Sequence, residues 1–308
     1  MLREWVNAAG RAVVRSAILA EVVGPRFASA VRILTYHTVP DRAAFAAQMA
    51  FLTDHYVPVG QDAVLAALGG APLPRMAVWV TFDDGAPDVV RQGLPVLRAA
   101  GVPATMFVCP GLIESGERAW WSRVERCDPV TLRERIPAPI TSTDDALVYL
   151  KSVPDGVRRE LVETLDPAGD DGHQLSEEQL DQWLDAGFGI GNHTWDHPIL
   201  DRCPEDEQRS QVARADAWLR ARVPGWAALF AYPNGNWSPT VADELAHRRY
   251  ALAVLHDHRI ARSLGDRYRI SRLDVRASDD VARFRGVVSG VQPTLAAAVA
   301  RVRVAVGP

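Results

Sequence analysis

Asp83 and Asp84 are consecutive carboxylates that directly follow an apolar run ending at Phe82. Burial of two adjacent carboxylates costs free energy unless a cation or hydrogen bonds compensate their charges. On an extended backbone the two side chains point in opposite directions, which allows them different roles. A solvated Asp-Gly turn, completed by Gly85, is the alternative interpretation of this motif.

His193 and His197 are separated by four positions. If a helix begins here, this spacing places both imidazoles on one face, where paired histidines bind a metal ion. For the pair alone, two exposed or core histidines are the alternative interpretation. Together with one carboxylate, the two histidines make three ligands and leave a position for water or substrate, as in catalytic zinc sites.

A hydrolytic site of this kind also needs groups that transfer protons. The second carboxylate would serve as the general base, and a separate histidine would protonate the leaving group. His37, at the end of an apolar run, is the candidate acid, with a hydrogen-bonded core histidine as the alternative. His256 and His258 lack an evident third ligand, and we interpret them as surface residues.

Short apolar runs alternate with helical periodicity from residue 31 onward, which predicts a mainly parallel sheet or barrel. Catalytic groups in such folds lie at the carboxyl ends of the strands, where the polar motifs above are found. A capping-box pattern at Ser176 and Gln179 predicts the start of a helix. The predicted strands are 31–36, 77–82, 104–108, 187–191, 227–232, 251–256 and 269–275, and helical periodicity is found in 45–52 and 89–100.

The composition is that of an ordinary protein with a sizeable core, since 48% of the 308 residues are hydrophobic and 23% are charged. The formal charge of -4, without long runs of like charge, predicts no nucleic-acid partner. No window has the roughly 18 to 20 apolar residues that a transmembrane span needs. The three cysteines include no CxxC pair, so neither a disulfide framework nor a cysteine-rich zinc module is predicted.

Residues 1–30 form a predicted N-terminal amphipathic segment, with small and apolar residues at helical spacing between positions 2 and 21. One interpretation is a helix packed on the main body, and the other is a surface that rests on a membrane or on a membrane-bound partner. Charged residues interrupt the segment too often for a secretory signal. The predicted location is therefore the cytoplasm, with peripheral contact to the inner face of the membrane as an extension.

Four motifs resemble those of the polysaccharide deacetylase family, the NodB-homology or carbohydrate esterase family 4 enzymes. The resemblance extends over roughly residues 31–276. Because Tyr36-His37 comes first and the segment 269–273 last, the order is similar to that of the branch whose barrel motifs are circularly permuted. The motifs are Thr81–Gly85 (TFDDG), Ala104–Val108 (ATMFV), His193–His197 (HTWDH) and Phe230–Gly235 (FAYPNG).

The resemblance implies a role for each residue that matches a family motif. Asp84, His193 and His197 would be the metal ligands, and Asp83 would be the base that takes a proton from the attacking water. His37 would be the acid, at the place of the catalytic histidine in the permuted branch. The ligand set implies one divalent transition metal, with zinc as the default and cobalt, nickel or iron as alternatives.

The third motif combines a match with a departure. The resemblance makes Tyr232 and Pro233 substrate-binding residues, with the backbone amide of Tyr232 as a donor to the oxyanion. Many members have an arginine that orients the base where this sequence has Ala231. Arg272, in the last predicted strand, is the candidate for that role, and an arginine that pairs with a surface carboxylate is the alternative.

Pattern and resemblance together predict an α/β fold, a distorted (β/α) barrel of about seven parallel strands with an N-terminal helix. The barrel would occupy residues 31–308, with a helical insertion at about 110–180. In the insertion, Trp120 and Trp121 would form a wall of the sugar site by stacking, or would be a pair of packing residues.

The function implied is metal-dependent hydrolysis of an N-acetyl group of an amino sugar, in a glycoconjugate or polysaccharide precursor. Since no export segment is recognised, the expected substrate is an N-acetylated saccharide that is nucleotide-linked or lipid-linked. Three alternatives remain open. One is a related C–N hydrolase that acts on a formamide or another non-sugar amide, and the second is a carbohydrate-binding protein that keeps the motifs without turnover. The third is a structural or partner-binding barrel, which the matched polar positions disfavour.

Overall fold

The computed structural model describes residues 16–165, 174–296 and 298. At its centre is a parallel sheet with the strand order β7-β6-β5-β4-β3-β1-β8, and a short strand, β2, pairs with β3 outside this path. Each predicted apolar run corresponds to one strand of the path, whereas β2 was not predicted. The strands are β1 (Arg32–Tyr36), β2 (Val57–Pro58), β3 (Ala77–Phe82), β4 (Ala104–Val108), β5 (Gly189–Asn192), β6 (Leu229–Ala231), β7 (Leu252–Val254) and β8 (Leu273–Asp274).

The segment that contains β8 contacts β7 at the far end of this strand order as well as its neighbour β1. Ile270 forms a parallel bridge with Val254 of β7, and three residues later Leu273 pairs with Leu34 of β1. The sheet therefore curls into a distorted (β/α) barrel, which confirms the predicted fold class. Strands β1, β3 and β4 are buried along their whole length, which is why their sequences are continuous apolar runs.

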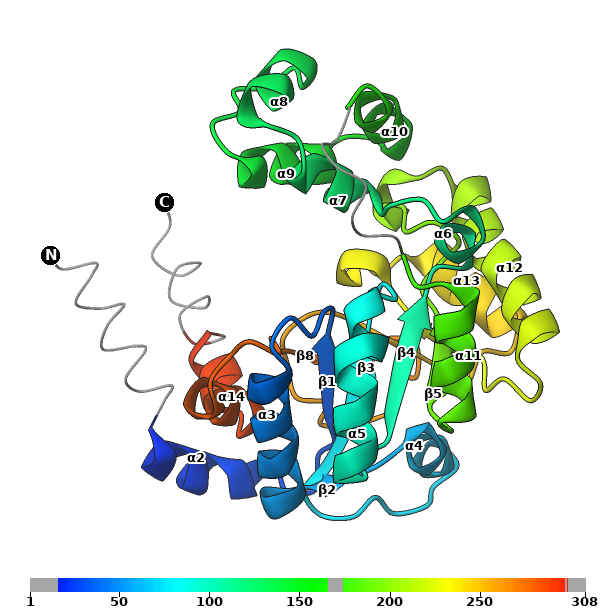
Figure 1. Ribbon diagram of the computed structural model, residues 1–308. Helices are drawn as coiled ribbons and strands as arrows, with labels where there is room; N and C mark the ends of the chain where they lie inside the picture. Colours follow the sequence, from blue (N-terminus) through cyan, green and yellow to red (C-terminus); the bar gives the residue numbers. More distant parts are fainter. Residues whose placement is uncertain (1–15, 166–173, 297, 299–308) are drawn as a thin grey trace, which may run out of the picture.

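Helices pack around this sheet, and on one side α3 packs against both α5 and α14 (Figure 1). The capping box at Ser176 is present and begins α11, as predicted. The predicted helix at 89–100 begins with a π-helical turn, η2. The helices are α2 (Ala17–Val23), η1 (Gly24–Phe27), α3 (Arg42–His55), α4 (Gln61–Leu68), η2 (Val89–Gly93), α5 (Leu94–Ala100), α6 (Pro110–Ser115), α7 (Trp120–Glu125), α8 (Pro129–Arg135), α9 (Thr143–Ser152), α10 (Asp155–Glu163), α11 (Glu177–Asp185), η3 (Leu200–Arg202), α12 (Glu205–Arg222), η4 (Pro233–Gly235), α13 (Pro239–His247) and α14 (Val281–Val288).

The connection between β4 and β5 is long and helical, and it divides into two parts. Helices α7 to α10 share their own apolar cluster, which includes Trp120, Leu132 and Leu150. Helix α11 instead returns to the barrel, where Leu180 and Trp183 join the main core. Figure 1 shows α7 to α10 grouped beyond the ends to which the strand arrows point. These four helices therefore lie at the end of the barrel where catalytic groups are expected.

Residues 1–15 of the predicted amphipathic segment lie outside the described residues. The helix that follows, α2, is anchored to the main body through the buried side chain of Arg32. This guanidinium donates to the carbonyl oxygens of Gly24 (3.0 Å) and Val288 (2.8 Å). Among the residues that the structure describes, no helix is long and apolar enough to cross a membrane.

Candidate metal and catalytic site

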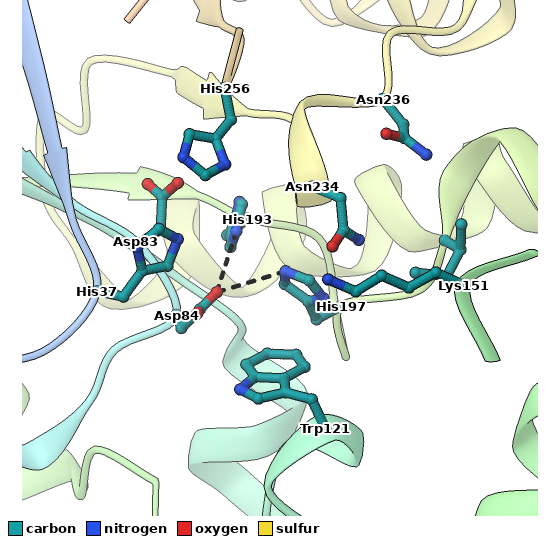
Figure 2. A pocket seen from close by; sticks show the side chains of 11 residues that line it. His37, Asp83, Asp84, Trp121, Lys151, His193, His197, Asn234, Asn236 and His256 are labelled. Atoms are coloured by element: carbon teal, nitrogen blue, oxygen red, sulfur yellow. Dashed lines mark ion pairs between the residues drawn. The ribbon is translucent and has the colours of Figure 1, made fainter. Parts of the chain in front are cut away.

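A pocket of about 450 Å³ opens at the carboxyl ends of the strands. Most of its lining residues lie on the segments that follow β1, β3, β5, β6 and β7, and two come from the helical insertion. Figure 2 shows how these side chains converge on one space. The lining residues are His37, Asp83, Asp84, Trp121, Lys151, His193, His197, Ile199, Asn234, Asn236 and His256.

Asp84, His193 and His197 form a compact cluster in this pocket. The Oδ1 atom of Asp84 lies 3.3 Å from Nε2 of His193 and 3.4 Å from Nε2 of His197. This Oδ1 is buried and has no hydrogen-bond partner, and the three ligand atoms all lie within 4.8 Å of one another. An unpartnered carboxylate oxygen between two imidazole nitrogens fits a cation, and this donor set suits a transition metal.

A hydrogen bond orients the imidazole of His193, and burial favours the neutral form of His197. Nδ1 of His193 donates to the carbonyl oxygen of Ala231 over 2.8 Å, which leaves Nε2 with a free lone pair in the neutral ring. Burial lowers the pKa of His197 to about 3, although the charge of Asp84 opposes this, so His197 is neutral at pH 7. Burial acts to raise the pKa of Asp84, but the two imidazoles outweigh it and lower the value to about 2.

The backbone brings these ligands together by tight turns, and the helix predicted at His193 is absent. Thr194 (φ 70°) and His197 (φ 59°) adopt left-handed conformations, and the Thr194 hydroxyl accepts from the amide of His197 over 3.1 Å. Asp84 is also left-handed (φ 70°), so the two carboxylates diverge because of a turn, and the predicted extended backbone was wrong. Such conformations cost about 1–3 kcal/mol each in non-glycine residues and cluster at functional sites.

Asp83 forms a buried, bidentate ion pair with Arg272. Nη1 and Nη2 of Arg272 donate to the two carboxylate oxygens of Asp83 over 2.7 Å and 2.6 Å. The guanidinium also donates to the hydroxyl of Thr81 and the carbonyl oxygen of Leu255. Arg272 is fully buried, so the alternative of a surface arginine was wrong. A guanidinium thus contacts Asp83 from Arg272, directly before β8, whereas position 231 is an alanine.

The charge of Asp83 is set by its surroundings. Burial by itself acts to raise the pKa of Asp83, but the Arg272 guanidinium and the nearby imidazole of His193 outweigh it. The pKa therefore lies well below its ordinary value, and Asp83 is ionised at neutral pH. An ionised carboxylate at the pocket wall can accept a proton.

His37 lies in the pocket, at the end of β1, and a second imidazole faces it. The ring centroids of His37 and His256 are 5.3 Å apart, and Nε2 of His256 lies 3.4 Å from Oδ1 of Asp274. The interpretation of His256 as a surface residue was wrong, because its side chain is three-quarters buried and lines the pocket. Its place directly after a strand is the signal that could have identified it.

The third motif contributes other groups than those predicted. The amide of Tyr232 donates to the carbonyl oxygen of Val254 over 3.1 Å, so it is not free to stabilise an oxyanion. Tyr232 and Pro233 are buried, and neither lines the pocket. The residues that do line it are Asn234 and Asn236, which sequence reasoning missed because the family motif drew attention to the residues before them.

Of the two tryptophans in the insertion, only Trp121 reaches the pocket. Its ring lies 4.3 Å from the ring of His197, centroid to centroid. Trp120 is buried in the core of the insertion, where the guanidinium of Arg158 lies 4.8 Å from its ring. The prediction that Trp120 forms a wall of the sugar site was therefore wrong, since the structure assigns it the packing role.

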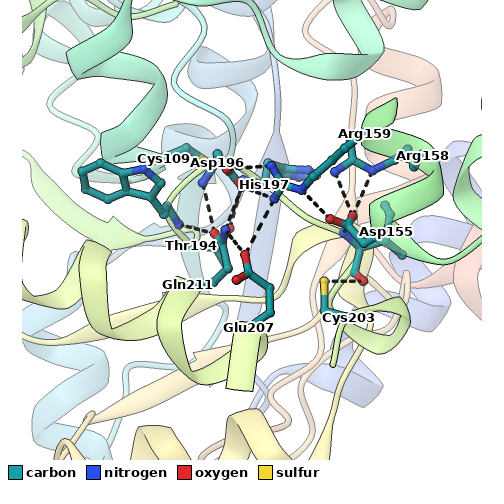
Figure 3. Close-up of polar contacts among 12 residues, drawn as sticks. Cys109, Asp155, Arg158, Arg159, Thr194, Asp196, His197, Cys203, Glu207 and Gln211 are labelled. Atoms are coloured by element: carbon teal, nitrogen blue, oxygen red, sulfur yellow. Dashed lines mark hydrogen bonds and ion pairs between the residues drawn. The ribbon is translucent and has the colours of Figure 1, made fainter. Parts of the chain in front are cut away.

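An ion network joins the insertion to the loop that carries His197 (Figure 3). The guanidinium of Arg159 in α10 donates to both oxygens of Asp196, over 2.8 Å and 2.9 Å, and to the buried Asp155 over 2.7 Å. Asp155 in turn accepts from the amide of Ile199 over 3.0 Å. On the other side, Gln211 of α12 donates to Asp196 over 2.9 Å. The loop is thus held from both sides by charged and amide groups.

Comparison with known proteins identifies the family. The family model described as polysaccharide deacetylase matches residues 70–253, which is more than half of the chain. The chain therefore belongs to the polysaccharide deacetylase family. This membership supports carbohydrate de-N-acetylation as the reaction class. No curated protein gives a significant match to the chain.

Solved structures show the same fold at low sequence identity. The deacetylase PplD of Streptococcus pyogenes is 19% identical, with a TM-score of 0.62 over 84% of this chain and 98% of that chain. IcaB from Ammonifex degensii is 22% identical, with a TM-score of 0.60 over 86% of this chain and 97% of that chain. A de-N-acetylase from Aggregatibacter actinomycetemcomitans is 14% identical, with a TM-score of 0.59 over 83% and 99%.

Removal of one partner of the Asp83–Arg272 pair leaves a buried charge without compensation. We expect Arg272→Leu to lower the free energy of unfolding at pH 7 by about 3–5 kcal/mol, as for other broken buried pairs. The double variant Asp83→Leu/Arg272→Leu should cost less than the sum of the two single variants. Urea denaturation measures all three. Because the folded-state pKa of Asp83 is depressed, its stabilisation is present at neutral pH and is lost as the pH falls through the acidic range.

The matched control is Arg283→Leu, which removes an exposed arginine paired with Asp279 over 3.0 Å. Exposed pairs contribute about 0–1 kcal/mol, so this variant should change stability little. Equal effects of Arg272→Leu and Arg283→Leu would contradict the importance of the buried pair.

Proposed function

We propose that this protein is a metal-dependent carbohydrate N-deacetylase that hydrolyses the acetamide group of an amino sugar to acetate and a free amine. The observation that carries this proposal is the meeting of three groups in one pocket: the Asp84-His193-His197 cluster, an ionised carboxylate at Asp83, and an imidazole at His37. The similar PplD structure is a complex with acetate, the carboxylic acid product that this reaction would release.

Asp84, His193 and His197 would hold one divalent transition metal, with zinc as the first candidate because imidazole and carboxylate ligands suit it. When bound, such a cation supplies Lewis acidity that polarises the acetamide carbonyl. The chain itself supplies the ligand geometry through the left-handed turns at Asp84 and His197. It also supplies the neutral state of His197 that ligation requires.

Asp83 is the proposed general base. Its carboxylate accepts a proton from the attacking water while Arg272 fixes the orientation of both carboxylate oxygens. The water oxygen then forms the new bond to the acetyl carbon. Arg272 is a positioning residue in this scheme, because it is fully buried and touches Asp83 without lining the pocket.

His37 is the proposed general acid. As the carbon–nitrogen bond breaks, the leaving amine takes a proton from the imidazole of His37, and acetate is released. His256 lies beside His37 and pairs with Asp274. A second imidazole and a carboxylate are therefore close to the proposed acid. Trp121 at the pocket wall offers an apolar face on which a sugar ring can stack.

The geometry of this site disfavours the binding-only protein, and family membership disfavours the non-sugar amide hydrolase. The binding-only alternative depended on the missing arginine at Ala231, and Arg272 provides a guanidinium for Asp83. Family membership favours a carbohydrate over a non-sugar amide. A nucleotide-linked or lipid-linked substrate, and a cytoplasmic location near the membrane, stay predictions from the sequence.

The metal site is tested by elemental analysis of purified protein. We expect about one equivalent of a transition metal in the wild type and its loss in both Asp84→Ala and His193→Ala, since each variant removes one of three ligands. His256→Gln is the matched control, because it removes a pocket imidazole outside the cluster and should retain the metal. A folded wild type that binds no metal after resupply would overturn the metal-dependent mechanism.

The ion network of the insertion should tune metal affinity, because Asp196 directly precedes the ligand His197. We expect Arg159→Gln to weaken metal binding about 10- to 100-fold, as is typical when the groups that orient a ligand are removed. Competition with a chelator of known affinity measures this change. Arg209→Gln is the control, since Arg209 makes only long ion pairs of 3.8 Å and 3.6 Å on α12 and α13. An affinity of Arg159→Gln equal to that of this control would contradict the role of the network.

Catalysis is tested by acetate release from N-acetylglucosamine oligomers. We expect Asp83→Asn to lower kcat about 100-fold or more while the metal remains bound, because an amide cannot accept the proton. Asp185→Asn, at an exposed site at the end of α11, should retain activity. Undiminished turnover by Asp83→Asn would exclude Asp83 as the base. A metal-loaded wild type that releases no acetate from any acetylated sugar would favour the binding-only alternative.

A further inference from the structure

The pocket has two chemically different sides, with the Asp84-His193-His197 cluster between them. Figure 2 shows Asp83, His37 and His256 on one side, and Lys151, Asn234 and Asn236 on the other. The first side contains the proton-transfer groups of the proposed reaction. The second side has no role in that chemistry, so it is free to contact a part of the substrate remote from the acetamide.

Lys151 is the only lysine of the chain, and it lines the pocket from α9 of the insertion. In the described part of the chain, no carboxylate forms an ion pair with it. The charge of Lys151 acts to lower the pKa of Glu125, against the larger effect of burial, and Glu125 is not part of the pocket lining. An ammonium group is a donor without acceptor capacity, so Lys151 offers a positive charge and hydrogen-bond donors at this wall of the pocket.

Asn234 offers a second donor on the same side. Its Nδ2 atom is buried and has no hydrogen-bond partner. Its backbone is left-handed (φ 54°) and belongs to the 3-10 turn η4. The next residue, Gly235, lies close against the backbone of His256. A buried donor without a partner costs free energy in the free protein, and a bound acceptor removes that cost.

The two donors together select the chemistry of the group that they bind. A sugar hydroxyl can satisfy Asn234, but it gains little from an ammonium group, whereas a phosphate or carboxylate gains a charge-assisted hydrogen bond from Lys151. Of the two carboxylates in the pocket, Asp83 is already compensated by Arg272, and Asp84 would be compensated by the metal ion of the proposed function. Complementarity therefore favours a negatively charged, acceptor-only group.

We propose that Lys151 and Asn234 form a subsite that binds an anionic substituent, a phosphate or a carboxylate, of the acetylated sugar. This inference rests on the proposed function, because it names the class of substrate for the same pocket. It also assigns a task to the insertion, which holds Lys151 on α9 and is tied to the metal-binding loop through Arg159. The insertion thus contributes Lys151 to substrate selection, and the barrel contributes Asn234 together with the groups of the proposed chemistry.

The test compares three sugars that share the acetamide: N-acetylglucosamine 1-phosphate, N-acetylmuramic acid and the uncharged methyl N-acetylglucosaminide. With zinc-loaded, full-length wild type, we expect kcat/KM for at least one anionic sugar to exceed that for the uncharged sugar by 10-fold or more. The phosphate and carboxylate arms show which anion is preferred. In Lys151→Met and Asn234→Ala, this ratio should fall toward one.

The matched control is Arg135→Met, which removes an exposed cation of the same insertion that does not line the pocket. This variant should keep the wild-type ratio. A wild type that prefers neither anion overturns the subsite. A preference that persists in both pocket variants also overturns it, because the anion is then held by the metal cluster.

Calorimetric binding of the same three sugars separates this inference from the proposed function. If the wild type hydrolyses none of them, the proposed function fails for these sugars, and the affinity ratio then decides on the subsite. Tighter binding of an anionic sugar that is lost in Lys151→Met supports the subsite even without turnover. Equal affinities for charged and uncharged sugars reject it.

Discussion

The geometry of this site depends on an ion pair between a fully buried arginine and a buried aspartate that lie far apart in the chain. Arg272 and Asp83 are 189 residues apart in the chain, and each would be costly to bury alone. Their pairing requires β8 to return to β1, which is the neighbour of β3 in the sheet. The same guanidinium donates to the carbonyl oxygen of Leu255 after β7, so Arg272 contacts segments from both edges of the sheet.

The metal-binding cluster depends on a different constraint, which is the left-handed backbone at Asp84, Thr194 and His197. Such turns are strained in non-glycine residues and need surrounding groups to maintain them. The carbonyl oxygen of Ala231 holds one imidazole, and the Arg159 network holds the loop of the other. The helical insertion is thus part of the support of the site, besides forming a wall of the pocket.

Much of the fold could be predicted, because strands buried on both faces leave continuous apolar runs and a capping box marks the start of α11. The ligands Asp84, His193 and His197 were proposed from motifs and lie together. The predictions failed where the backbone conformation or the contacts of a residue were inferred from local sequence spacing alone. Left-handed turns at Thr194 and His197 replace the helix considered at His193, the amide of Tyr232 donates to the neighbouring strand, and His256 lines the pocket after β7.

The sequence by itself determined the types of chemical groups and their order along strand ends, since both depend on local spacing and on the alternation of apolar runs. It also determined family membership, because the motifs are contiguous. Only the tertiary structure decided which groups meet: Arg272 with Asp83, His256 with His37, and Lys151 with the pocket. These contacts join segments far apart in the chain. For Arg272 and Asp83, the pairing is selected by the cost of burying a charge without compensation, a cost that no single segment reveals.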